Sequence, residues 1–342
     1  MKNKNILNKS EYIKLIFLYT YGNNQAIRAK DEYARYWLYE FGISNPRALH
    51  LSLIKDGYLQ KSSPKDIISR SRAYELKEMC ESLGLAKTGK KELLIQRIFE
   101  NASNEQLFLL CDNLDVYSRS QMGEEFVNIH SDYMELYRNK DWGISLDEYN
   151  SYKSELPFSP SFKDVAWGIM NQRSLLYTLS HDQRARNNYF HMFQLLDTEQ
   201  RHSQAMEYLL YVLFFDINCS LSARLKYETA HQPLDSLELA PGIIEKIIKY
   251  EKYYSECLVD VIYSQYVDFP IIICPDNIFK EMLYELYTLP TLDEDKYLDI
   301  FRNNFNNLTE LVVKNNNLSK PHGCSTNTIA LLVIIVVTFL FS

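Results

Sequence analysis

Glycine is scarce in this chain of 342 residues. Only ten glycines occur, and none lies between Gly168 and Gly242 or between Gly242 and Gly323. Proteins built from strands and tight turns need more glycine than this, because glycine adopts positive φ at little cost. The scarcity therefore favours an all-helical fold.

The sequence also lacks the common short motifs of catalysis and cofactor binding. It contains no G-x-G-x-x-G, G-x-x-x-x-G-K-[ST], G-x-S-x-G or H-E-x-x-H segment. Its six cysteines include no C-x-x-C pair, which excludes a zinc knuckle and a dithiol redox motif and fits reduced thiols in the cytosol. We expect a protein that is not an enzyme, with no catalytic residues, no metal and no cofactor.

One metal-ligand pattern needs a separate argument. Glu199 with His202 and Glu228 with His231 form two Glu-x-x-His units, and paired units of this kind build di-iron sites in helical bundles when further carboxylates face them. No glutamates stand at matched positions, and Pro233 follows His231 closely enough to end a helix. Surface Glu/His pairs are the better interpretation.

Length and charge indicate several units in one chain. A chain of 342 residues exceeds the usual size of one core, and its net charge is −7. We expect four segments, all helical: a small N-terminal unit over 1–62, a helix–loop–helix module over 66–101, a helical domain over 102–318 and an apolar tail helix over 324–342.

The N-terminal unit reads as three helices. Glu11–Thr20 and Asp31–Glu40 carry apolar and aromatic residues at helical spacing, and Asn45 with Pro46 predicts the start of a third helix, which ends before Gly57. Helix, turn, helix and then GYL resembles the core of a winged helix-turn-helix. The alternative is a small helical cap. The segment SSPK (62–65) predicts a linker into the next unit.

The segment Ala73–Phe99 is the most informative stretch of the chain. Apolar residues recur at helical spacing, Gly84 stands where a helix C-cap favours positive φ, and a second helical period begins near Lys90. Neither short helix can bury its apolar face alone. We expect the two to pack on each other around a core of Leu76, Met79, Leu83, Gly84, Leu85, Leu94 and Ile98.

The order LK-x-x-x-x-x-LGL-x-x-x-GKKEL-x-x-RI in this stretch resembles the SAP domain, a helix–loop–helix module that binds nucleic acid. The resemblance covers Leu76, Lys77, Leu83, Gly84, Leu85, Gly89, Lys90, Lys91, Glu92, Leu93, Arg97 and Ile98. It implies that the loop and the start of the second helix face DNA phosphates. The residues concerned are Lys87, Thr88, Gly89, Lys90, Lys91 and Arg97. A helix N-terminus with lysines beside it is also a favourable place for an anion.

Charge limits the strength of such binding. Between Lys65 and Ile98 there are eight basic and five acidic residues, whereas the rest of the chain carries −10. A patch making three or four phosphate contacts belongs with dissociation constants of about 10⁻⁴–10⁻⁶ M at physiological salt. Useful occupancy then requires a second contact, self-association or tethering. The other interpretation of these lysines is a solvated surface.

Beyond Asn101 the chain reads as a series of amphipathic helices. Ser145 with Glu148 predicts the start of one of them. Phe190–Asp216 resembles one tetratricopeptide-type hairpin, with the small Ala205 where two helices approach. No 34-residue period recurs, so the alternatives are a plain bundle and a degenerate repeat. Pro241 predicts the start of a long helix.

The order of units resembles that of uncharacterised bacterial and phage proteins that contain SAP domains. The resemblance is greatest in 159–173 and 240–247.

The last segment carries no Asp, Glu, Lys or Arg from Pro321 to Ser342, and Ile329–Phe341 is apolar but for one threonine. As a helix, Cys324–Ser342 would be about 28 Å long, against a hydrocarbon thickness of about 30 Å. Lys314 and Lys320 precede it, which places the body of the protein on the cytoplasmic face of the membrane. The alternative is a tail buried in the fold of a cytoplasmic protein.

Two functional hypotheses follow from these features. In the first, a SAP-like module binds DNA weakly through its basic loop, and the membrane anchor tethers it. In the second, the helical domain after residue 101 binds a protein partner at the membrane and the SAP-like module is structural.

Overall fold

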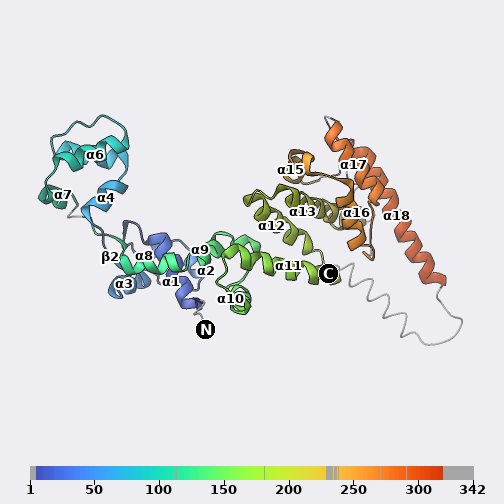
Figure 1. Cartoon of the computed structure of the whole chain (residues 1–342), viewed down its shortest axis with the longest axis horizontal. Helices are drawn as coiled ribbons and strands as arrows, with labels where there is room; N and C mark the ends of the chain where they lie inside the picture. Colours follow the sequence, from blue (N-terminus) through green and yellow to red (C-terminus); the bar gives the residue numbers. More distant parts are fainter. Residues whose placement is uncertain are drawn as a thin grey trace. The chain divides into compact units, whose positions relative to one another are not determined.

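The computed structural model describes residues 5–318, apart from 112–113, 181, 229–233, 235–236, 238, 270 and 290. The chain divides into two units, Met1–Ile169 and Met170–Ser342. The described residues are mostly helical, which confirms the all-helical class in its coarse form (Figure 1). The predicted tail helix over 324–342 lies outside the described residues.

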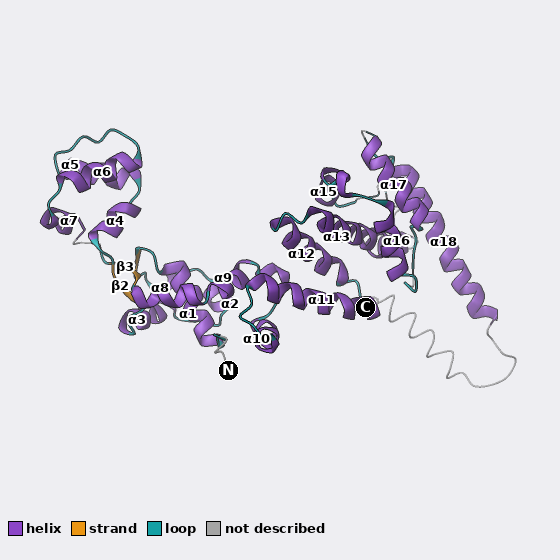
Figure 2. Ribbon diagram, in the orientation of Figure 1, coloured by secondary structure: helices purple, strands orange, loops and turns teal. Residues whose placement is uncertain are grey.

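The first unit contains a small sheet as well as helices (Figure 2). Its elements are α1 Lys9–Tyr21, β1 Gln25–Ala26, the 3₁₀ turn Lys30–Glu32, α2 Tyr36–Tyr39, α3 Pro46–Lys55, β2 Leu59–Lys61, α4 Pro64–Arg70, α5 Ala73–Ser82, α6 Lys91–Asn101, α7 Asn104–Cys111, β3 Val116–Arg119, α8 Gln121–Ile129, α9 Ser131–Arg138, the 3₁₀ turn Lys140–Trp142 and α10 Leu146–Glu155. Helix α11, Phe162–Ser180, spans the boundary between the units.

The sheet corrects the expected domain boundary at residue 62. Its order is β1-β3-β2, and the central strand β3 pairs antiparallel with both neighbours, Gln25 lying opposite Tyr117 and Leu59 opposite Arg119. The N-terminal unit is therefore completed by a strand that follows α7. Residues 62–115 form an insertion between β2 and β3, and both ends of this insertion are attached to the sheet. The winged-helix-like arrangement of the N-terminal unit stays a prediction.

Helix starts in this unit follow local capping chemistry. The Asn8 side chain accepts from the Glu11 N–H at 3.0 Å while Glu11 accepts from the Asn8 N–H at 2.9 Å, a capping box that starts α1. Asn45 accepts from the Ala48 N–H at 3.2 Å ahead of Pro46, as expected for α3. Ser63 caps α4 in the same way, so the predicted linker SSPK is the start of a helix.

The expected helix over Asp31–Glu40 is only four residues long, as α2. Tyr33 has extended backbone angles, which let its ring pack 5.2 Å from the ring of Tyr21. Trp37 and Phe17 complete this aromatic core, with ring centroids 5.1 Å apart. His50 is fully buried beside them and exchanges a hydrogen bond of 2.9 Å with the Tyr33 hydroxyl. Burial lowers the pKa of His50 to about 4, which keeps the ring neutral at physiological pH.

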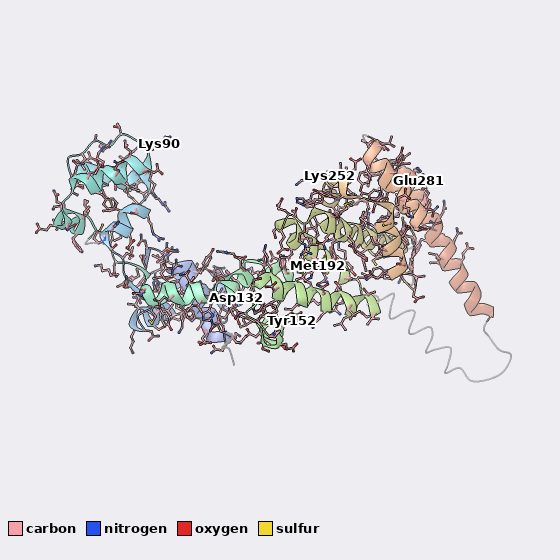
Figure 3. All side chains as sticks on the ribbon, viewed as in Figure 1. Lys90, Asp132, Tyr152, Met192, Lys252 and Glu281 are labelled. Atoms are coloured by element: carbon pink, nitrogen blue, oxygen red, sulfur yellow. The ribbon has the colours of Figure 1, made fainter. Side chains whose placement is uncertain are left out.

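A buried ion pair joins α9 to α10. The Lys153 ammonium lies 2.5 Å from the Asp132 carboxylate, which also accepts from the Tyr149 hydroxyl at 2.8 Å. Lys153 is only 4% exposed, and its Nζ lies 4.3 Å from the centre of the Tyr133 ring. Figure 3 labels Asp132 in this region. Because the charges, hydroxyl and ring satisfy one another, the cluster fixes α10 on α9.

The second unit is a helical domain. Besides the end of α11 it contains α12 Ala185–Thr198, α13 His202–Phe215, a π-helical turn Asp216–Leu221, α14 Ser222–Glu228, α15 Pro241–Lys249, the 3₁₀ turn Glu251–Tyr253, α16 Glu256–Gln265, α17 Asp276–Thr288 and α18 Glu294–Leu318. Helices α12 and α13 form the expected hairpin, with Ala205 fully buried. Whether this hairpin belongs to a bundle or to a degenerate repeat stays a prediction.

Two features of this unit differ from expectation. The predicted long helix after Pro241 ends at Lys249, because the buried Tyr250 ring packs on Phe193 and its hydroxyl donates to Asp197, which turns the chain before α16 begins. The continuous helical stretch His202–Lys226 is long and apolar enough to cross a membrane, but 72% of its most apolar window is buried in the protein. We interpret this stretch as the core helix of the domain.

Candidate nucleic-acid interface

The SAP-like stretch forms the two helices that its sequence predicts. Helix α5 ends at Ser82, and the next residues close its end in a Schellman-type turn. The Leu85 N–H donates to the Cys80 carbonyl at 2.7 Å, and Gly84 adopts φ +68° between them. A residue with a side chain would be strained at this φ, so Gly84 fixes the point where the loop leaves the helix.

The core of the module includes most of the predicted residues. Leu76, Leu94 and Ile98 are fully buried, and Met79, Leu83 and Leu85 are half-buried against them. The same cluster also contains buried residues from the helices on either side, Ile67 and Ile68 of α4 and Cys111 of α7. The module is therefore larger than the expected 66–101 and runs from α4 to α7, because two short helices alone could not enclose this core.

The predicted contact residues lie on the loop between α5 and α6. Lys90 and Thr88 are exposed, and Lys91, the first residue of α6, is half-buried. Lys90 stands at the N-cap position of α6, where no side chain caps the helix. Figure 3 shows Lys90 at the end of the module opposite β2 and β3. Free N–H groups and two lysines at one helix start form a local positive field.

Two of the predicted contact residues have partners within the module. The Lys87 ammonium lies 2.9 Å from the Glu81 carboxylate, so its charge is partly compensated. The Arg97 guanidinium donates to the Thr88 carbonyl at 3.0 Å and to the Ala86 carbonyl. Arg97 therefore holds the loop from α6, and its expected phosphate contact stays a prediction.

Position 89 requires glycine because of its backbone angles and because of the neighbouring side chain. Its φ is +129°, and a Cβ at this position would lie 2.8 Å from Leu93 Cδ2. Its neighbour Thr88 is held by Arg97 through its carbonyl, and Lys90 begins the next helix. The loop thus has a defined path, on which Lys87 and Lys90 are exposed.

A hydrogen-bond network that the sequence did not reveal attaches the module to the sheet. The Ser62 and Ser118 hydroxyls are 2.7 Å apart, and the Ser118 hydroxyl donates to the Asn24 side chain at 2.8 Å. Asn24 Nδ2 in turn donates to the Asp66 carbonyl at 2.7 Å. These residues come from the turn before β1, from β3 and from the start of the module and are up to 94 positions apart, so no local pattern could have indicated them.

The first of the two Glu-x-x-His units does not lie on one helix. Glu199 is the C-cap of α12 and His202 the first residue of α13, so a turn separates them and they do not share a helix face. The His202 ring lies against Tyr250 instead, 5.1 Å between ring centres. His231 lies outside the described residues. Among the residues that the structure describes, no three His, Cys, Asp or Glu side chains gather as metal ligands.

No protein-family model matches the chain, and neither a curated protein nor a solved structure matches it.

Proposed function

We propose that this protein binds the phosphate backbone of DNA through the loop of its SAP-like module and is tethered to a membrane by its C-terminal segment. The observation that carries the proposal is the loop itself: Lys90 and Lys91 form no ion pair in the described structure, while Arg97 holds the loop that precedes them. Lys90 and Lys91 therefore lie beside the uncapped start of α6, and a phosphate can approach both the lysines and the free N–H groups of this helix start.

Replacing Lys90 and Lys91 by alanine should weaken DNA binding in a salt-dependent way. Each lost phosphate contact lowers the slope of log K against log salt concentration by about 0.9, so we expect a decrease of about 2 for the pair. Replacing Lys87 should have a smaller effect, because Glu81 already compensates its charge. The measurement is fluorescence anisotropy with a labelled 30-base-pair AT-rich duplex over a series of salt concentrations.

The matched control for this pair is Lys249→Ala with Lys252→Ala, two exposed lysines of the second unit. It removes the same charge and should leave the slope unchanged. If the Lys90/Lys91 variant binds with the same slope as the unmodified protein, or if the protein does not bind the duplex at low salt, the DNA-binding proposal is wrong.

The tether makes a separate prediction. In the full-length protein, Ile335→Arg places a charge at the centre of the apolar segment, where it costs about 3 kcal/mol of insertion free energy. We expect the unmodified protein to float with liposomes and to resist alkaline carbonate, and the variant to be extracted. Ile335→Leu should behave like the unmodified protein. Full-length protein that stays soluble in the presence of liposomes would instead indicate a tail buried in the fold.

A second candidate function is favoured by one surface of the second unit. Leu175, Leu176 and Leu179 on α11 are 63%, 62% and 73% exposed and follow one another at helical spacing. Such an apolar stripe is typical of a protein-binding surface. In this alternative the helical domain is the binding part of a membrane-associated scaffold, and the loop lysines can be lost without effect.

A further inference from the structure

Positive charge without a counterion is concentrated in the first part of the chain. Residues 1–101 contain eighteen basic and eleven acidic residues, whereas 102–169 contain five basic and twelve acidic ones. In the latter segment Arg119, Arg138, Lys140 and Lys153 each lie within 4 Å of a carboxylate. Most basic side chains of 102–169 are thus paired with carboxylates, whereas 1–101 contains more basic than acidic residues.

Three of these available cations lie on consecutive elements before the module. Arg47 and Lys55 belong to α3 and lie on the same side of that helix, because eight residues bring the side chain back to within about 80°. Lys61 follows at the end of β2. All three are exposed, and in the described structure none of them pairs with a carboxylate. Asp56 is the one acidic residue between Arg47 and Lys61.

Hydrogen bonds attach the start of the module to the sheet directly after Lys61. The Ser62 N–H donates to the Val116 carbonyl at 3.0 Å, directly after Lys61, and the Ser62–Ser118–Asn24–Asp66 network continues the connection into α4. The module therefore begins directly after strand β2, and the cations of α3 and β2 and those of the loop belong to the same unit of the chain.

We infer that Arg47, Lys55 and Lys61 form a second phosphate-binding site, which acts on the same nucleic acid as Lys90 and Lys91. The inference rests on the proposed function. Because Lys90 lies at the end of the module opposite β2, one ligand reaches both sites only if it is long and carries phosphates along its length (Figure 3). A duplex meets this requirement, since it carries one charge per about 1.7 Å of its axis. The second site supplies the further contacts that a small module needs.

The test is a salt titration of full-length protein in non-ionic detergent with the labelled 30-base-pair duplex. The variant Arg47→Ala/Lys55→Ala/Lys61→Ala should lower the log–log slope by about 2.7, which corresponds to three phosphate contacts. The pair Lys90→Ala/Lys91→Ala should lower it by about 2, and the two sets together by about the sum. Sedimentation should give one duplex per chain. The matched control is Lys246→Ala/Lys249→Ala/Lys252→Ala, which removes three positive charges from the second unit and should leave the slope unchanged.

The outcomes separate the two proposals. If the Arg47/Lys55/Lys61 variant keeps the original slope while the Lys90/Lys91 variant loses it, the second site is wrong and the proposed function stands. If neither changes the slope, the proposed function fails. An equal loss in the Lys246/Lys249/Lys252 variant would show a general effect of net charge and overturn the second site, and so would two duplexes per chain. Unfolding midpoints followed by tryptophan fluorescence report folding of the Arg47/Lys55/Lys61 variant, because Trp37, Trp142 and Trp167 all lie in the first unit. Hydrogen exchange of the α6 and α15 amides reports folding of the other two variants.

Discussion

Replacing Asp132 by alanine should destabilise the first unit by about 3–5 kcal/mol. The carboxylate is 2.5 Å from the Lys153 ammonium and accepts the Tyr149 hydroxyl, so its removal leaves a buried cation and a buried hydroxyl without partners. Urea unfolding followed by tryptophan fluorescence measures the effect, since the three tryptophans lie in this unit.

The loss in this variant comes from the buried partners that the substitution leaves without a counterpart, so removing the second charge as well should restore stability. Combining Asp132→Ala with Lys153→Met should recover most of the loss. An Asp132→Ala variant that is as stable as the unmodified protein would mean that the Asp132–Lys153 pair contributes nothing to the stability of the first unit.

Local signals in the sequence were enough to place most helices. Asn45 and Pro46 begin α3, and Gly84 ends the turn after α5, because capping bonds involve residues only a few positions apart. The helices of the SAP-like stretch and the burial of Leu76, Leu94 and Ile98 follow from the same short-range periodicity.

The pairing of strands that lie far apart in the chain could not be predicted from such local signals. Strands β1, β2 and β3 have two to four residues, too few to show an alternating pattern, and β3 pairs with residues that lie 56 or more positions away. The insertion of the module in the sheet was therefore not predicted. The hydrogen bonds from Arg97 to the loop were not predicted for a related reason, since a sequence does not show which carbonyls a guanidinium meets across a loop.

The loop of the module is ordered although it is exposed, and this is relevant to its role. The loop from Lys87 to Lys90 is exposed and contributes little to the core. Its order is maintained by Arg97 and by two glycines with positive φ. Such order without burial is expected of a surface that binds a ligand.

Leu76→Ala provides the sharpest test between binding and structural roles of the module. The side chain is fully buried between α5 and α6, and its truncation should lower the free energy of opening of these helices by about 2–5 kcal/mol. Hydrogen exchange of the α5 and α6 amides measures this loss directly, because no tryptophan lies in the module. If the loop binds DNA, the apparent affinity should fall by the fraction of molecules in which the module is open, so the loss is measurable once the opening free energy approaches zero.

Leu109→Ala is the matched control, a leucine of α7 that is 73% exposed, and it should change neither exchange nor DNA affinity by more than about 0.5 kcal/mol. DNA affinity that stays constant while α5 and α6 open would contradict binding through the loop. The contact would then have to lie elsewhere on the first unit, and the cations of α3 and β2, which do not depend on the core around Leu76, would be the remaining candidates on the described surface.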